Sequence, residues 1–256
     1  MITSLHNDRV KLAHALQTAA KARRKERKIA LEGVRLLRDA LAQGYTPDFI
    51  LYDPTLIDEK EIVGAQPAAL LRAQYLPVSS EVMRHISATE QPPGVVGVFP
   101  MPDATLPDAP QRVLILDDLR DPGNLGTILR TAAAAGVEAV LLSPKTVDPY
   151  NPKALRGGMG AHFRIPLAEG SWGEIGAYCA GLHIYLADMT GDVAYDAADW
   201  SRPWALIIGS EAHGDSAEAS QLAHQRVYIP MAGDTESLNA AVAAGVILFA
   251  AKRTQK

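Results

Sequence analysis

The stretch VLILDDLRDPGNLG at residues 113–126 sets the pattern for the larger part of this chain. A short apolar run at 113–116 is followed by a polar loop and then by a helical pattern. The residues at helical spacing are Leu125, Ile128, Leu129, Ala132 and Gly136. Short apolar strands that alternate with helices are typical of a buried parallel sheet. The stretch therefore predicts an α/β domain.

The same alternation continues toward the C-terminus. Further strands are expected at residues 139–142, 184–186, 206–208 and 227–229. A final helix carries Leu238, Val242, Gly245, Val246 and Phe249. In parallel α/β sheets, ligands bind beyond the carboxyl ends of strands. We therefore expect a site where the loops after Leu116, Ile208 and Ile229 meet.

The first hundred residues have a different pattern. Strands are expected at 29–32, 49–52 and 94–99, and Val34, Leu37, Ala40 and Leu41 recur at helical spacing until Gly44. Residues 100–110 contain four prolines and no apolar periodicity, which is typical of an extended linker. The expected domains are a small α/β domain at 1–100, the linker at 101–110 and a larger α/β domain at 111–256.

The charge is distributed unevenly. The net charge is −4, yet residues 1–43 hold 10 Lys and Arg against 4 Asp and Glu. The densest run covers residues 21–28. Such a run suits a phosphate backbone, although a solvated helix face is the commoner explanation. The candidate RNA-binding residues are Arg23, Arg24, Lys25, Arg27, Lys28 and Arg35.

Cysteine content and hydropathy bear on the compartment. Cys179 is the only cysteine, so no internal disulfide can form, and its apolar surroundings favour a core residue over a nucleophile. The N-terminal residues include His6, Asn7, Asp8 and Arg9 where a signal peptide needs an apolar run. No stretch reaches the roughly 18 apolar residues of a membrane span. We expect a cytoplasmic protein that is not exported.

The first polar loop, residues 117–124, leads into a helix that contains Arg130. Asn124 is expected to cap this helix. The side chain of Arg130 should lean back toward the loop, where it either serves a reaction or forms a salt bridge with the aspartates. The acidic loop matches no calcium-binding spacing, and no metal site is expected.

Two further polar loops follow predicted strands. Gly209-Ser210-Glu211 with Gly214 contains two glycines that would let a ligand approach the backbone. Residues 229–239 form a glycine-containing turn that enters the last helix, where Ser237 or Thr235 could act simply as a cap. Each loop alone is ambiguous.

The order of the three loops resembles the SpoU branch of the SPOUT RNA methyltransferases. The first motif is residues 121–126 with Arg130, the second is Gly209 to Glu211 with Gly214, and the third runs from Ile229-Pro230-Met231 to Ser237-Leu238-Asn239. The resemblance covers residues 111–256. Residues 30–33 and 94–98 are similar to an L30e-like substrate-binding domain that is often fused to this branch. Pro93 and Gly157 depart from residues common in the family, which bears on substrate identity.

The resemblance implies a fold, a cofactor and a set of roles. The larger domain would contain a deep trefoil knot and bind S-adenosylmethionine through Gly209, Ile229, Met231 and Leu238. Its catalytic residues would be Arg130, Asn124, Glu211, Ser237 and Asn239. The reaction would be methylation of a ribose 2′-hydroxyl, with 23S ribosomal RNA a better expectation than transfer RNA, and the site would be completed in a homodimer.

Two other functions stay open on the sequence. One is an RNA-binding homologue without catalysis, against which the joint presence of the five catalytic candidates argues. The other is a nucleotide-dependent oxidoreductase, but no Gly-x-Gly-x-x-Gly follows a strand. The sequence does not separate a housekeeping enzyme from one that protects ribosomes from antibiotics.

Overall fold

The computed structural model describes residues 1–256 except 64–73, 104, 211–213, 234–236 and 254–256. The chain forms two compact units. Unit 1 comprises Met1–Pro102 with Tyr150–Phe163, and unit 2 comprises Asp103–Pro149 with Arg164–Lys256. The segment Tyr150–Phe163 thus packs with the N-terminal part of the chain. The division into domains at 1–100, 101–110 and 111–256 stays a prediction.

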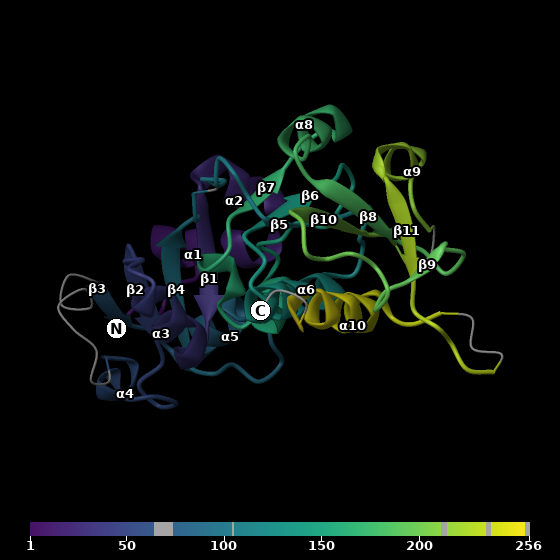
Figure 1. The fold of residues 1–256 in the computed structure, drawn as a ribbon. Helices are drawn as coiled ribbons and strands as arrows, with labels where there is room; N and C mark the ends of the chain where they lie inside the picture. The colour runs from purple at the N-terminus through teal and green to yellow at the C-terminus, as the bar shows by residue number, and fades with distance from the viewer. Residues whose placement is uncertain (64–73, 104, 211–213, 234–236, 254–256) are drawn as a thin grey trace. The chain divides into compact units, whose positions relative to one another are not determined.

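Unit 1 is a mixed sheet with helices on its faces (Figure 1). The sheet has the order β1-β4-β2-β3, in which only the β2–β3 pair is parallel. Its elements are α1 (Asp8–Thr18), α2 (Ala20–Glu26), β1 (Lys28–Glu32), α3 (Val34–Ala42), β2 (Phe49–Tyr52), α4 (Glu59–Val63), β3 (Gln74–Pro77), α5 (Ser80–Ile86), β4 (Val95–Pro100), α7 (Pro152–Gly158) and the 3₁₀ turn η2 (Ala161–Phe163).

The core of unit 1 lies between the sheet and the helices α1 and α5. Val10 and Leu16 of α1 and Met83 of α5 pack on Leu51 and Val98 of the strands, and all five are buried. The apolar spacing that predicted these strands arises because each buries its side chains in this way. The strand at Gln74–Pro77 was not predicted, since only its half-buried edge position distinguishes it from a loop.

Unit 2 is a seven-stranded parallel sheet in the order β7-β6-β5-β10-β8-β11-β9. Its elements are β5 (Arg112–Leu116), α6 (Pro122–Ala135), β6 (Ala139–Leu142), β7 (Leu167–Glu169), α8 (Trp172–Tyr178), β8 (His183–Ala187), β9 (Val193–Ala194), β10 (Trp204–Ile208), α9 (Ala217–Leu222), β11 (Gln225–Tyr228) and α10 (Ala240–Arg253). The predicted α/β class with a parallel sheet is confirmed. The trefoil knot stays a prediction.

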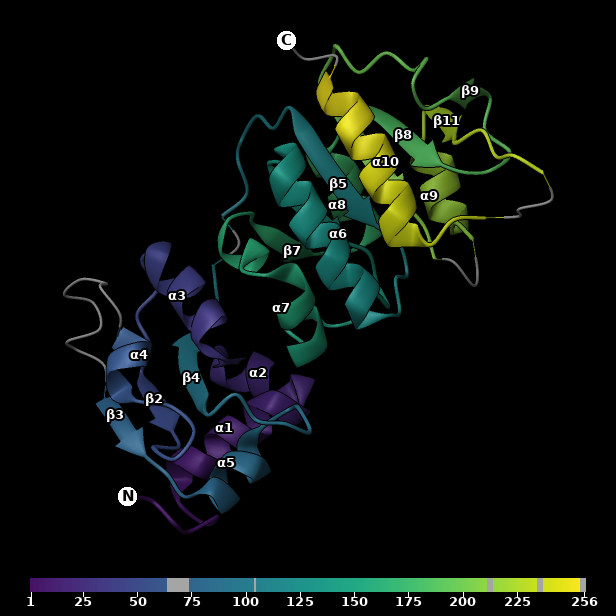
Figure 2. The same ribbon diagram turned by 90° about the horizontal axis from the view of Figure 1, so that it is seen from below.

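Helices cover both faces of this sheet, with α6 and α10 on one face and α8 and α9 on the other (Figures 1 and 2). The central strands are buried on both sides, as the continuous apolar runs predicted. Cys179 lies in the core beneath α8, where burial raises the pKa of its thiol to about 12. The thiol is therefore protonated at neutral pH, and the prediction of a core residue is confirmed.

The residues that the last helix, α10, buries differ from the apolar set identified in the sequence. Val242 and Phe249 are exposed, and Leu238 precedes the helix. The residues that α10 buries are Ala240, Ala241, Ala244, Ile247, Leu248 and Ala251. Small alanines at these positions let α10 pack closely, and α6 is its main neighbour.

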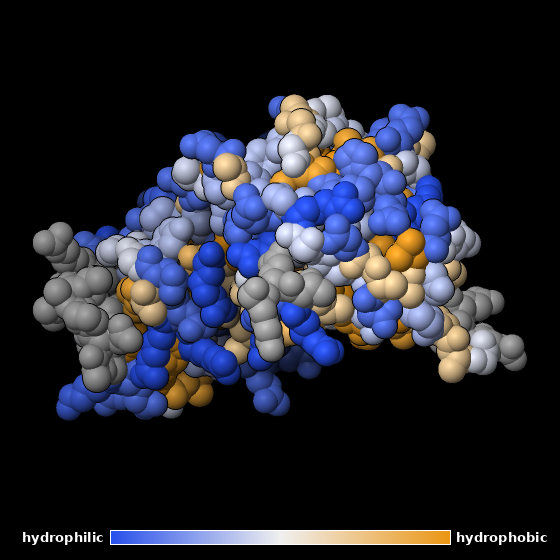
Figure 3. All heavy atoms as spheres, in the orientation of Figure 1, coloured by the Kyte–Doolittle hydropathy of each residue, from blue (hydrophilic) through white to orange (hydrophobic). Residues whose placement is uncertain are grey.

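Most apolar side chains of the chain lie in its interior. Hydrophilic side chains cover most of the face in Figure 3, with smaller apolar areas between them. Within the described ranges, no helix is both long and apolar enough to cross a lipid bilayer.

Candidate functional site

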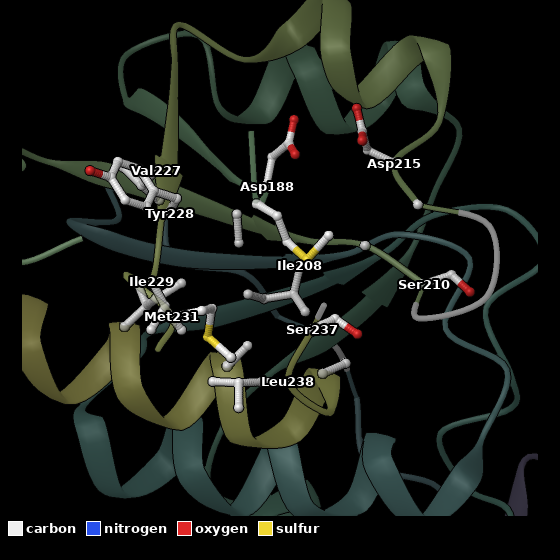
Figure 4. A pocket seen from close by; sticks show the side chains of 17 residues that line it. Asp188, Ile208, Ser210, Asp215, Val227, Tyr228, Ile229, Met231, Ser237 and Leu238 are labelled. Atoms are coloured by element: carbon white, nitrogen blue, oxygen red, sulfur yellow. The ribbon is translucent and has the colours of Figure 1, made fainter. Parts of the chain in front are cut away.

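A cavity of about 220 Å³ lies in unit 2 at the carboxyl ends of β8, β10 and β11, against the start of α10 (Figure 4). Because parallel strands end at the same edge of the sheet, segments far apart in the sequence meet here. The lining residues are Ala187, Asp188, Met189, Ile208, Gly209, Ser210, Gly214, Asp215, Val227, Tyr228, Ile229, Met231, Ser237, Leu238, Ala240, Ala243 and Ile247.

The four residues predicted to bind the cofactor all line this cavity. Gly209 follows β10, Ile229 and Met231 follow β11, and Leu238 precedes α10. Ile229, Met231 and Leu238 come together on one side of the cavity in Figure 4. Their apolar side chains suit the flat faces of a heterocycle, and the loop backbones supply polar groups. Ser237, predicted to be catalytic, also lines the cavity.

The local backbone geometry of the second loop explains why Gly209 and Gly214 are glycines. Gly214 has a φ of +67° and donates its N–H to the Ser210 carbonyl at 3.0 Å. A Cβ on Gly209 would lie 3.2 Å from the Gly214 carbonyl oxygen. The two glycines therefore let the backbone at Gly214 lie against Gly209 and Ser210, whereas the sequence suggested only a close approach to a ligand. Glu211, predicted to be catalytic, lies outside the described residues.

A side-chain hydrogen bond joins the first and third motifs. Nδ2 of Asn239 donates to Oδ1 of Asn124 at 3.1 Å. Oδ1 of Asn239 accepts the backbone N–H groups of Ala241 and Val242 at 3.0 and 3.3 Å. Asn239 thus caps α10 while its amide group holds Asn124 at the start of α6. Two predicted catalytic residues from opposite ends of unit 2 meet in this way.

The predicted caps of α6 and α10 are corrected by these contacts. Asp121, not Asn124, is the N-cap of α6, and its carboxylate accepts the Asn124 N–H at 2.8 Å. Pro122 at the first helical position fixes this start, so Asn124 falls in the first turn. Asn239 takes the capping role suggested for Ser237, and Thr235 lies outside the described residues.

Arg130 is exposed on α6 and is not part of the cavity lining. Among the residues that the structure describes, it forms no hydrogen bond or ion pair. The salt bridge with the aspartates that the sequence left open is not formed, because Asp118 pairs with Arg120 instead. The guanidinium of Arg130 is thus exposed on α6, the helix whose first turn contains Asn124.

The acidic loop after β5 has a structural role at Asp117. This carboxylate is buried and accepts the Ser143 hydroxyl at 3.0 Å and the Ser216 N–H at 2.8 Å. It therefore ties the loop after β5 to the loops after β6 and β10. Within the described part of the chain, no group of three or more His, Cys, Asp or Glu side chains could hold a metal ion.

Sequence reasoning missed the part of the cavity that follows β8. Asp188 and Met189 line it from this strand end, and Asp215 faces it from the loop after β10. Burial alone would raise the pKa of Asp188, but hydrogen bonds from Thr190 and Arg226 outweigh burial and hold it below its ordinary value. The rule that ligands gather at strand ends could have found these residues, since Asp188 follows an apolar strand as Asp117 does.

The predicted RNA-binding residues of unit 1 divide into two groups. Arg23 is buried, and its guanidinium donates to the Leu16 carbonyl at 2.6 Å. It therefore stabilises α1 and is not part of the exposed surface. Lys28 forms an ion pair with Asp48 at 2.7 Å. The exposed members are Arg24, Lys25, Arg27 and Arg35, which we call the basic face.

Comparisons with known proteins agree with this geometry. Residues 111–249 match the SpoU rRNA Methylase family, and residues 7–97 match the MRM3-like substrate binding domain. The chain is 34% identical to the 23S rRNA (guanosine(2553)-2'-O)-methyltransferase RlmP of Bacillus subtilis, with 97% of each chain covered. It is 35% identical to the mitochondrial rRNA methyltransferase 3 of Mus musculus, covering 90% of this chain and 68% of the mouse protein.

Two solved structures are similar over nearly the whole chain. The SpoU methyltransferase AviRb from Streptomyces viridochromogenes in complex with AdoMet has a TM-score of 0.87 at 28% identity, covering 97% of this chain and 98% of that one. An AdoMet-bound rRNA methyltransferase from Sinorhizobium meliloti has a TM-score of 0.85 at 32% identity, covering 99% and 97%. The chain therefore belongs to the SpoU rRNA methylase family.

Proposed function

We propose that this protein transfers a methyl group from S-adenosylmethionine to a ribose 2′-hydroxyl of ribosomal RNA, with 23S rRNA as the substrate. The observation that carries the proposal is the cavity at the carboxyl ends of β8, β10 and β11, lined by all four predicted cofactor residues. Family membership supports the reaction class. The printed names of the Bacillus and mouse relatives support ribosomal RNA over transfer RNA.

The cavity fits an adenosyl group in its chemistry. Its apolar wall contains Ile229, Leu238 and Ile247, and the backbone at Gly209 offers polar groups beside it. When bound, S-adenosylmethionine supplies a methyl group on a positively charged sulfur, so the protein needs no covalent intermediate. Gly209, Ile229, Met231 and Leu238 would hold the cofactor.

The work of the remaining residues is to orient and stabilise the attacking oxygen. The 2′-hydroxyl attacks as it loses its proton, which a phosphate oxygen of the RNA would accept, and the guanidinium of Arg130 stabilises the negative charge that develops on the oxygen. A guanidinium is too weak an acid to be deprotonated, so it acts electrostatically rather than as a base. Asn124 and Asn239, joined by their amide groups, fix the start of α6 relative to the cavity. Ser237 and Glu211 complete the proposed set.

The basic face of unit 1 provides the proposed contact with RNA phosphates. Replacing Arg24, Lys25 and Arg27 by Ala should weaken RNA binding and lower the salt dependence of the affinity, because each lost phosphate contact removes about 0.7 to 0.9 from the slope. Filter binding at several salt concentrations measures this, with Arg202→Ala as the control. An unchanged slope would remove the basic face from the proposal.

A homodimer in the cytoplasm completes the proposal. Val242 and Phe249 are exposed on α10 at 51% and 45%, and Val246 lies half-buried between them at helical spacing. Exposed apolar stripes of this kind favour a protein partner, here a second copy of the chain. The single buried thiol suits a reducing compartment.

The test is methyl transfer to purified RNA. The protein, incubated with S-adenosylmethionine labelled in its methyl group, should label 23S rRNA at a 2′-O-methyl nucleotide and leave transfer RNA unlabelled. Mapping 2′-O-methyl groups in cells with and without the gene then identifies the nucleotide. Labelling of transfer RNA alone would show that transfer RNA, and not 23S rRNA, is the substrate. Binding of cofactor and RNA without transfer would identify an inactive homologue.

A further inference from the structure

A network of charged residues lies beside the cavity and is not explained by cofactor contacts. Arg226 of β11 donates through Nη1 to Oδ2 of Asp188. Its Nη2 lies 3.5 Å from Oδ2 of Asp215 and donates to the Ser220 hydroxyl at 2.9 Å. The Ser220 hydroxyl in turn donates to Asp215. One guanidinium therefore bridges two carboxylates that belong to different loops.

Each carboxylate belongs to a segment that shapes the cavity. Asp188 begins the turn after β8, and its backbone N–H donates to the Val227 carbonyl at 3.0 Å. Asp215 follows Gly214, whose N–H closes the second loop on Ser210. Both aspartates line the cavity, whereas Arg226 does not. Any effect of Arg226 on a ligand is thus exerted through these two segments.

The energetics favour a specific role for the guanidinium. The side chains of Asp188, Asp215 and Arg226 are exposed at 15%, 23% and 33%, so their interactions are only partly screened by solvent. Without the guanidinium, two neighbouring carboxylates would repel each other and lose a shared donor. A lysine ammonium is a point charge and cannot match the forked geometry of arginine toward both.

We propose that Arg226 is a positioning residue that holds the turn at 188–191 and the segment Gly214–Asp215 in the arrangement that binds the adenosyl cofactor. This inference rests on the proposed function. It concerns cofactor affinity rather than the transfer step, because Arg226 contacts neither the first motif nor Asn239 among the described residues.

The test compares Arg226→Met and Arg226→Lys with Arg202→Met. Arg202 pairs with Asp199 at 3.1 Å before β10, at the other end of the strands, and serves as the matched control. Calorimetry should show that Arg226→Met weakens S-adenosylmethionine binding about tenfold or more, that Arg226→Lys lies between it and the natural chain, and that Arg202→Met changes it less than about twofold. The KM for cofactor should rise while the KM for RNA stays constant.

Several outcomes decide the inference. Unchanged cofactor affinity in Arg226→Met overturns it, and so does an equal loss in Arg202→Met. If Arg226→Met does not fold, Asp215→Asn carries the test, since it removes one bridged charge and keeps the shape. That variant should also bind the cofactor more weakly, and unchanged affinity overturns the inference. Absence of cofactor binding in the natural chain would instead overturn the proposed function.

Discussion

The two ends of the parallel sheet in unit 2 are built from different kinds of side chain. The carboxyl ends surround a cavity whose lining combines glycines, carboxylates and hydroxyls with apolar side chains. The amino ends carry aromatic rings, in which Trp200 packs 4.3 Å from Tyr185 and 5.4 Å from Trp204 between ring centroids. The difference indicates that the carboxyl ends form a ligand site and that the amino ends contribute to stability. Variants at the two ends can separate these roles.

The largest effect is expected at Arg130. Arg130→Ala should lower the rate of methyl transfer by roughly a hundredfold or more, because a charge that stabilises the developing alkoxide is lost. Cofactor affinity should stay within about twofold, since Arg130 does not line the cavity. Rates with labelled cofactor and calorimetry measure the two quantities. Arg112→Ala, at the start of β5, is the control, and joint loss of rate and cofactor binding would make Arg130 structural.

A second test uses two glycines that flank β8. A Cβ on Gly191, beyond the carboxyl end, would lie 2.8 Å from the Val227 carbonyl carbon and 3.0 Å from the Asp188 oxygen. Gly191→Ala should therefore displace the turn after β8 and weaken cofactor binding about tenfold. Gly181, before the strand, has open space around its Cβ position, so Gly181→Ala should leave binding unchanged. If both substitutions weakened cofactor binding equally, the proposed difference in role between the two ends of the sheet would be wrong.

At the amino ends, Trp200→Phe should affect stability alone. The substitution removes the hydrogen bond from Nε1 to the Tyr195 carbonyl at 2.8 Å. A loss of about 1 kcal/mol in the free energy of unfolding is expected from denaturant titration. Cofactor affinity should not change, and a weaker affinity would show that the two ends are coupled.

The smallest effect is a pH dependence at His183, which stacks on His224 at the amino ends. Burial lowers the pKa of His183, and Arg202 and His224 lower it further, while Asp199 opposes them. A depressed folded-state pKa means that stability is full above the unfolded pKa of about 6.5 and falls as the pH drops toward the folded value. Melting temperatures between pH 7 and pH 5, at about constant ionic strength, should fall less for His183→Gln. An identical pH profile would exclude this histidine as the source.

The sequence predicted the buried strands, whose continuous apolar runs are distinctive, but it did not predict β3, β7 and β9, which are short strands at the edges of the two sheets. The runs at 49–52 and 139–142 coincide with β2 and β6, and the second and third motifs lie at strand ends as expected. Membership of the SpoU family was also predicted correctly from the three motifs. Local sequence patterns were sufficient to predict an element where its residues have a single structural role, as in apolar runs that are buried on both faces of a sheet.

Contacts across long sequence distances were beyond such reasoning. Either Asp121 or Asn124 can accept a backbone N–H, and Pro122, which favours the first helical position, was the signal that could have identified Asp121 as the cap of α6. The burial of Arg23 depends on where α1 ends, and the exposure of Phe249 depends on how α10 packs on α6. The bridge from Arg226 to Asp188 and Asp215 depends on the order of strands in the sheet, which spacing along the chain does not encode.

The bond between Asn124 and Asn239 spans 115 positions of the chain, and Ile247 closes the cavity from α10. During synthesis on the ribosome, the cavity therefore cannot form until α10 has left the exit tunnel. A nascent chain that ends before α10 would have the parallel strands but no complete cofactor site, so competence for cofactor binding comes late in translation.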